Sequence, residues 1–233
     1  MSLSVILTCY NETPSIFDSY EKIVSFMDLT KIEYEIIIVD DGSLPDVQKQ
    51  LSNYFHEKNN TILLFSNANE GRGAAVTKGI RVSSKDYVGF IDTDLEIPES
   101  SLFNLYYGIT RDDSFDVVIG KRVYLLGCNL YHWLRAIYSR LYFLLANVFL
   151  NIHFLDTETG VKLFRRDKIL PVLDSVRDKR WFWDTEIIAQ SLKHNLKITQ
   201  LPVFLLRKKQ RSSVAFLRDT RRYLYGIYKY LRR

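Results

Sequence analysis

Three carboxylates at short intervals follow one apolar stretch of the chain. Residues 87–91 (Tyr-Val-Gly-Phe-Ile) are typical of a buried strand, and Asp92, Asp94 and Glu96 come directly after them. Carboxylates this close together repel one another unless a cation or hydrogen-bond donors hold them. Mg²⁺ and Mn²⁺ take oxygen ligands and keep open positions for phosphate oxygens. The pattern predicts a Mg²⁺ or Mn²⁺ site at these three residues, with a nucleotide diphosphate as co-ligand. A strand end followed by an acidic turn is the alternative.

Polar groups also follow the other strands that the sequence predicts. Strands are expected at 4–10, 34–39 and 61–65, and helices after them at 14–29, 45–58 and from about 75 to 83. Strands that alternate with helices pair in parallel, and their carboxyl ends open on one edge of the sheet. We therefore expect Glu12, Asp40, Asp41 and the loop 67–75 to lie near the Asp92 strand end.

The 233 residues fit one large α/β domain, or one domain with an appendage. A helix is expected at 98–111 and a strand at 117–120. The fold class expected for residues 1–212 is a mostly parallel central sheet with flanking helices, divided into halves at 1–96 and 97–212. Residues 213–233 are expected to form a separate basic amphipathic helix.

The cysteine count and the amino terminus indicate a cellular compartment. Two cysteines provide no disulfide framework and no zinc ligand set, and the four histidines lack metal-ligand spacing. A reducing compartment is therefore expected. The chain starts with a strand pattern instead of a basic and then apolar segment, so no secretory signal and a cytoplasmic location are expected.

The net charge of +5 comes from the carboxyl-terminal tail. Residues 207–233 hold ten Lys or Arg and one Asp, whereas the remaining residues carry a net charge of −4. At 100° per residue, the apolar residues of 216–233 fall on one side and the basic residues on the other. This pattern is typical of a helix at an anionic membrane surface, although a helix packed on the protein body would look similar. No nucleic-acid recognition motif accompanies the charge, so no nucleic-acid partner is expected.

A long apolar and aromatic helix is expected at 129–151. Its charge-free run ends at residue 155 and has 15 residues, fewer than the roughly 18 to 20 of a spanning helix. Such a helix must be buried in the fold, in the membrane interface, or in a partner such as a second copy or a membrane protein.

Four segments of the first half resemble the nucleotide-sugar-binding half of family 2 glycosyltransferases, which have the GT-A fold. They are 8–12 (Thr-Cys-Tyr-Asn-Glu), 39–43 (Val-Asp-Asp-Gly-Ser), 71–74 (Gly-Arg-Gly-Ala) and 92–94 (Asp-Thr-Asp). The resemblance implies that Asp40 and Asp41 contact the nucleoside, with Thr8, Tyr10 and Glu12 in the same pocket. It also implies that Gly71 and Arg72 bind the diphosphate, and that Asp92, Thr93 and Asp94 form the metal end of the site. Rim packing of Tyr10 and a plain helix start at Gly71 remain the structural alternatives.

Two segments of the second half closely resemble enzymes that glycosylate polyprenyl phosphates. They are 156–166 (Asp-Thr-Glu-Thr-Gly-Val-Lys-Leu-Phe-Arg-Arg) and 180–186 (Arg-Trp-Phe-Trp-Asp-Thr-Glu). The nearest resemblance is to dolichyl-phosphate β-glucosyltransferases, with dolichyl-phosphate mannose synthases next. It implies UDP-glucose as the first-choice donor, GDP-mannose as the second, and a polyprenyl phosphate acceptor at the inner face of the membrane.

The acceptor determines which catalytic groups are needed. A lipid phosphate is already an anionic nucleophile, so cations must hold it beside the donor, and direct attack inverts the anomeric centre. Arg122 is the first candidate for this task because it follows a strand end, and Lys121, Lys162, Arg165 and Arg207 are the others. Asp94, on the leaving diphosphate side, is the expected catalytic carboxylate.

An acceptor hydroxyl would instead need a general base, and Asp184 or Glu186 stands at the matching place. A helix cap at Asp184 is the structural alternative. Transfer to a hydroxyl of a cell-surface glycan or polymer is thus the second functional hypothesis. A sugar nucleotidyltransferase is a third, but it should carry a glycine-rich basic loop at 10–12, where this chain has Tyr-Asn-Glu.

Overall fold

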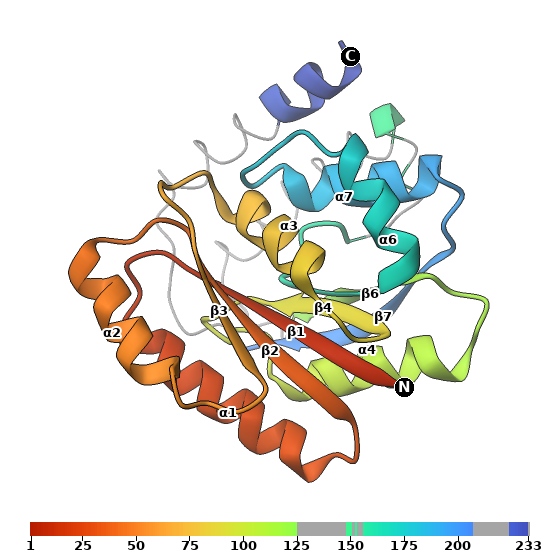
Figure 1. Ribbon diagram of the computed structural model, residues 1–233. Coiled ribbons are helices and arrows are strands. Elements are labelled where there is room, and N and C mark those ends of the chain that lie inside the picture. Colours follow the sequence, from red (N-terminus) through yellow and green to blue (C-terminus); the bar gives the residue numbers. More distant parts are fainter. Residues whose placement is uncertain (125–147, 151, 153–155, 207–223, 233) are drawn as a thin grey trace.

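The structure is a computed structural model that describes residues 1–124, 148–150, 152, 156–206 and 224–232. Most of the helix expected at 129–151 lies outside the described residues. Helices and strands alternate through the first half of the chain, in agreement with the sequence pattern (Figure 1). In chain order the elements are β1 (Ser2–Cys9), α1 (Ser15–Leu29), β2 (Glu33–Asp40), α2 (Pro45–Phe55), β3 (Thr61–Phe65), α3 (Arg72–Val82), β4 (Tyr87–Ile91), α4 (Ser100–Arg111), β5 (Val117–Tyr124), β6 (Val161–Arg165), α6 (Arg166–Val172), η1 (Leu173–Ser175), α7 (Trp183–Lys193) and β7 (Ile198–Leu205).

In the described part of the chain, seven strands form one sheet in the order β3-β2-β1-β4-β6-β5-β7. The pairs β1 with β2, β1 with β4, β2 with β3, and β5 with β7 are parallel. Strand β6 runs antiparallel between β4 and β5. The sheet is thus mostly parallel with flanking helices, which confirms the predicted fold class. The sequence pattern does not predict the direction of β6.

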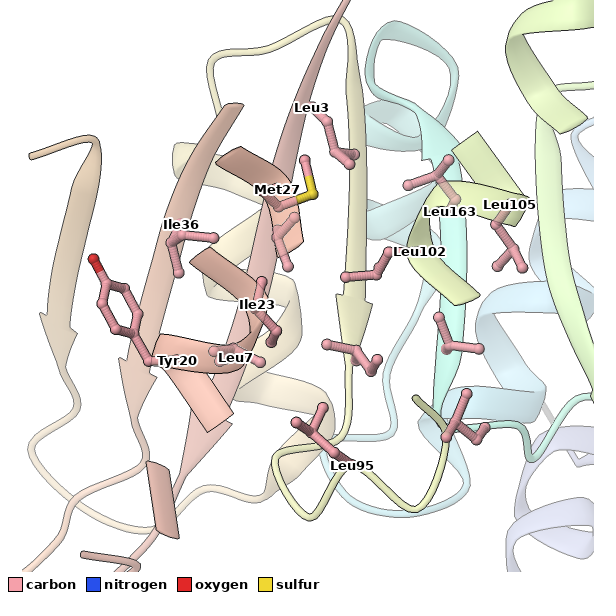
Figure 2. Close-up of a cluster of buried hydrophobic side chains, with 14 of the residues drawn as sticks. Leu3, Leu7, Tyr20, Ile23, Met27, Ile36, Leu95, Leu102, Leu105 and Leu163 are labelled. Atoms are coloured by element: carbon pink, nitrogen blue, oxygen red, sulfur yellow. The ribbon is translucent and has the colours of Figure 1, made fainter. Parts of the chain in front are cut away.

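Helices cover both faces of the sheet, so the central strands are apolar on both sides. In β1, Leu3 and Leu7 face one hydrophobic cluster, whereas Ile6 faces the other. Helices α1 and α4 pack on the first face, where Ile23 and Leu102 join the cluster (Figure 2). Helices α3, α6 and α7 pack on the second face (Figure 1). Each fully buried Leu or Ile contributes about 1.5–3 kcal/mol.

One edge of the sheet collects the strand ends that carry polar groups. The register places Cys9 at the end of β1 opposite Asp40 at the end of β2. Strand β6 starts at this edge, because Val161 lies opposite Ile91 at the end of β4. The loop 156–160, which precedes β6, therefore reaches the same edge.

The last described residues form a short helix, 224–231, that packs on the protein body (Figure 1). Ile227 and Tyr230 are buried, and the Tyr230 ring meets Phe182 edge to face at 6.2 Å. The outer side of this helix exposes the apolar residues Leu224, Tyr225, Tyr228 and Leu231. Packing on the protein body is the alternative that the sequence pattern left open, and Ile227 and Tyr230 pack in this way. Among the described residues, no helix has the length and hydropathy needed to cross a bilayer.

Candidate active site

A cavity of about 360 Å³ opens at the polar edge of the sheet. It brings together most of the predicted donor-site residues, from the ends of β1, β2 and β4 and the start of α3. The predicted residues in its wall are Thr8, Tyr10, Glu12, Asp41, Gly71, Arg72, Asp92, Thr93 and Asp94. Cys9, Asn69, Arg180 and Trp181 complete the lining.

Asp41 fixes the glycine loop at the start of α3. Its carboxylate accepts the backbone N–H groups of Glu70 at 3.0 Å and Gly71 at 2.8 Å. Gly71 has a φ of +115°, and an added Cβ would lie 2.5 Å from the carbonyl oxygen of Lys179. A side chain at this position would therefore be strained and would collide with the neighbouring backbone.

Asp40 does not line the cavity and is fully buried. Its carboxylate accepts the backbone N–H of Ser43 at 3.0 Å and the Gln48 amide at 2.9 Å, together with the Ser43 hydroxyl. Adjacent residues of a strand end point to opposite sides, so only one of the two aspartates can face a ligand. The structure places Asp41 on the cavity side and Asp40 in the support of its loop.

Arg72 joins the cavity to a chain of buried charges. Its guanidinium donates to Asp92 from Nε at 2.9 Å and to Asp184 from a terminal nitrogen at 2.5 Å. The fully buried Lys162 donates to the other oxygen of Asp184 at 2.6 Å and to the Thr159 carbonyl at 2.7 Å. Burial lowers the pKa of the Lys162 ammonium, and the contact with Asp184 opposes this shift. Asp184 is thus held between two cations.

Neither of the two candidate bases faces the cavity as a base would. Asp184 lies in the first turn of α7 but makes no capping hydrogen bond, so the predicted cap is wrong. Glu186 is fully buried and accepts the backbone N–H of Asp178 at 2.6 Å. Both carboxylates hold protein groups in place.

The three carboxylates after β4 do not converge on one point. Asp92 and Asp94 line the cavity, but Glu96 does not. The backbone turns at the buried Leu95, whose φ is +46°, so the extended spacing of the strand ends there. No group of three or more His, Cys, Asp or Glu among the described residues is arranged to hold a metal. Of the three predicted metal ligands, the structure therefore brings Asp92 and Asp94 to the cavity and leaves Glu96 outside its lining. Two carboxylates fit a Mg²⁺ or Mn²⁺ whose other ligands are phosphate oxygens and water.

Arg122 and the loop before β6 form a second charged cluster outside the cavity lining. Asp156 accepts two side-chain bonds from Arg122, at 2.9 and 2.6 Å, and its backbone N–H at 3.0 Å. Burial alone would raise the pKa of Asp156, but the Arg122 guanidinium outweighs it and lowers this pKa. Glu158 lies 3.9 Å from Arg122, and its Oε1 is buried without a hydrogen-bond partner in the described part of the chain.

Burial raises the pKa of Glu158 to about 7, and the nearby Asp156 and Asp184 act in the same direction. The folded protein therefore keeps a proton that the unfolded chain releases near pH 4.5. The stabilisation from this proton is complete below the unfolded pKa and is lost as the pH rises to the folded pKa.

Of the other predicted cations, Lys121 and Arg165 are described by the structure, and neither lines the cavity. Lys121 is exposed outside the cavity lining. Arg165 lies at the opposite edge of the sheet, where it contacts the Phe115 carbonyl and Asp113, both at 2.9 Å. Arg207 lies outside the described residues.

Four residues of the cavity lining have no role in the sequence prediction, namely Cys9, Asn69, Arg180 and Trp181. Cys9 and Asn69 lie inside segments that the sequence pattern had already marked. Burial raises the pKa of the Cys9 thiol to about 12. Arg180 and Trp181 lie in the segment 180–186, which the sequence pattern had also marked, but its place beside the glycine loop comes from a contact across about a hundred residues. The Lys179 carbonyl accepts the backbone N–H of Ala74 at 3.0 Å. Sequence spacing carries no signal for such a long-range contact.

A family model and several known proteins are similar to this sequence. The sequence model described as Glycosyl transferase family 2 matches residues 4–172. Dolichyl-phosphate beta-glucosyltransferase of Dictyostelium discoideum is 32% identical over 216 residues, which cover 86% of this chain and 65% of that protein. The enzyme of the same name from Saccharomyces cerevisiae is 26% identical, with 86% and 66% covered. The chain thus spans less than two thirds of each of these relatives.

Solved structures with the same fold include two sugar-transferring synthases. Glucosyl-3-phosphoglycerate synthase from Mycobacterium tuberculosis, in complex with Mn²⁺, UDP and glucosyl-3-phosphoglycerate, gives a TM-score of 0.69 at 17% identity, with 97% of this chain and 78% of that chain covered. Mannosyl-3-phosphoglycerate synthase from Rubrobacter xylanophilus gives 0.67 at 15% identity, with 100% and 74% covered. The fold is GT-A. With the family matched over more than half of its length, this chain belongs to glycosyl transferase family 2.

Proposed function

We propose that this enzyme transfers a hexose, glucose in the first instance, from UDP-glucose to a polyprenyl phosphate. The observation that carries the proposal is the cavity, which joins the ends of β1 and β2, two carboxylates after β4 and a glycine loop at one sheet edge. The named activity of the Dictyostelium and yeast relatives supports the acceptor. UDP in the mycobacterial complex supports the donor.

In this proposal, each wall of the cavity binds one part of the donor. Asp41, with Thr8, Tyr10 and Glu12, contacts the nucleoside. Asp92 and Asp94 hold a Mg²⁺ or Mn²⁺ that neutralises the leaving diphosphate. The support is that both carboxylates line the cavity, whereas Glu96 does not and has no part in the proposal.

The state of Asp184 favours a phosphate acceptor over a hydroxyl acceptor. A general base must reach the proton that it removes, but both oxygens of Asp184 are engaged by Arg72 and Lys162. A lipid phosphate attacks without losing a proton. We propose that Arg122 binds it, with Asp156 fixing the plane of the guanidinium, and that the direct attack inverts the anomeric centre.

Radiolabelled transfer separates the two acceptor classes. Labelled UDP-glucose, Mn²⁺ and a polyprenyl phosphate should yield label in the organic-extractable lipid. The Asp94→Asn variant should abolish this transfer, whereas a conservative change of Asp184 should leave it within a few-fold per folded molecule. Label found only in a polymer or glycan would overturn the lipid-phosphate acceptor.

We also propose that the enzyme works at the cytoplasmic face of the membrane and docks there through the outer side of helix 224–231. The support is that Leu224, Tyr228 and Leu231 are exposed and belong to the basic segment 207–233. Apolar and basic residues together suit an anionic membrane interface.

Sedimentation with vesicles that contain anionic phospholipid tests this surface. The double variant Leu224→Glu/Leu231→Glu should lose most of the bound fraction. Leu29→Glu serves as the control, because Leu29 is 85% exposed at the end of α1 and should bind like the unchanged protein. Equal sedimentation of all three proteins would remove helix 224–231 from the proposal.

A further inference from the structure

Protein oxygens already accept several of the hydrogen-bond donors at the start of α3. The backbone N–H groups of Glu70 and Gly71, just before the helix, donate to the Asp41 carboxylate. The backbone N–H of Ala74 in its first turn donates to the Lys179 carbonyl. The Arg72 guanidinium is donated to Asp92 and Asp184. A helix N-terminus binds an anion through such groups, and here protein oxygens already accept several of them.

A second cation in the cavity wall is available for this task. Arg72 and Arg180 are the two basic residues that line the cavity. Arg180 is exposed, and its guanidinium forms no ion pair with any described residue. Arg122, Lys162 and Arg165 are each ion-paired elsewhere. The uncommitted positive charge of the described cavity wall is therefore at Arg180.

The segment 178–181, named the strap, holds Arg180 in place at three points. The backbone N–H of Asp178 binds Glu186 of α7 at 2.6 Å. The Lys179 carbonyl accepts from α3, and the Lys179 ammonium pairs with Glu70. An added Cβ at Gly71 would lie 2.6 Å from Cγ of Arg180, so the aliphatic stem of Arg180 packs directly on the glycine loop. The guanidinium is thus presented from a fixed backbone beside that loop.

We propose that Arg180 binds the diphosphate of the nucleotide-sugar donor, a role that rests on the proposed function. The strap places this cation in the cavity wall, beside the glycine loop. Arg180 stabilises the charge that grows on the leaving diphosphate, and Arg72 keeps Asp92 in position.

Calorimetric titration of UDP in the presence of Mn²⁺ tests the role of Arg180. Arg180→Met should weaken UDP binding by about 10- to 100-fold, the range of a charge-assisted hydrogen bond. Binding of UMP should weaken less and that of uridine should not change, since uridine lacks phosphate. Arg180→Lys should recover part of the UDP affinity. Arg177→Met is the control, because Arg177 is exposed in the same connection outside the cavity lining and should bind UDP normally.

The other outcomes each overturn a specific statement. Unchanged UDP affinity in Arg180→Met overturns the role of Arg180 and leaves the proposed function standing. An equal loss for UDP and uridine overturns a phosphate contact, and so does unchanged UDP affinity with a raised KM for the lipid phosphate. If the unchanged protein binds neither UDP nor GDP in Mn²⁺, the proposed function fails together with this inference.

Discussion

Replacing Lys162 with methionine should destabilise the fold strongly, because Asp184 would lose one of its two cationic partners inside the protein. Lys162 is fully buried, and its Nζ lies 2.6 Å from Asp184. Removing one partner of a buried ion pair costs about 3–5 kcal/mol. Arg72 still contacts the second oxygen of Asp184, so we expect the lower end, about 3 kcal/mol. For a chain of this size, the melting temperature should fall by about 6–12 °C.

A double-mutant cycle tests whether this cost comes from the pair itself. Asp184→Asn alone leaves Lys162 and Arg72 without their shared carboxylate, so it should also be costly. In Lys162→Met/Asp184→Asn both charges are gone, and the loss should be smaller than the sum of the single losses by about 1–3 kcal/mol. Urea unfolding at pH 7 gives the three free energies.

Lys168→Met is the matched control, because Lys168 is half exposed in α6 and lies 3.9 Å from Asp167. It should change the free energy of unfolding by less than about 0.5 kcal/mol. Additive losses in the cycle, or a Lys162→Met variant as stable as this control, would refute the account of Asp184 as a carboxylate held by two cations.

Two further substitutions test the loop before β6. Because burial raises the pKa of Glu158 to about 7, Glu158→Gln should gain stability over the unchanged protein by about 2–3 kcal/mol between pH 4 and pH 8; a pH-independent difference in urea unfolding contradicts this. In Gly160→Ala, the new Cβ would lie 1.9 Å from Oδ2 of Asp92, so Mn²⁺-dependent UDP affinity should fall about ten-fold or more in calorimetry. Gly108→Ala, which meets only the Leu201 side chain, is its control, and equal affinities in both variants would contradict the placement of Asp92.

The polar edge of the sheet could be predicted from the order of apolar strands and helices along the chain. Apolar runs of strand length end in Glu12, Asp41 and Asp92, and parallel pairing brings such ends together. The antiparallel β6 could not be predicted, because a short apolar run reads the same in either direction. Its partners β4 and β5 also precede it by many residues.

The charge pairs inside the site could not be predicted either. Sequence spacing indicates that Asp184 lies near a helix start, but not that Arg72 and Lys162 meet it there. The position of Glu96 could not be predicted for a second reason. The backbone turns at Leu95, so Glu96 does not continue the alternation of an extended strand. Arg180 reaches the cavity through long-range contacts of its segment, such as those of Lys179 with Ala74 and of Asp178 with Glu186.

Anomalous diffraction from crystals soaked with Mn²⁺ and UDP-glucose tests the central claim most directly. The account predicts one manganese peak at coordination distance from the Asp94 carboxylate, on the cavity side of Asp92, with the diphosphate of the donor on its other side. A peak elsewhere, or a nucleotide sugar bound with no manganese near Asp92 and Asp94, would contradict it.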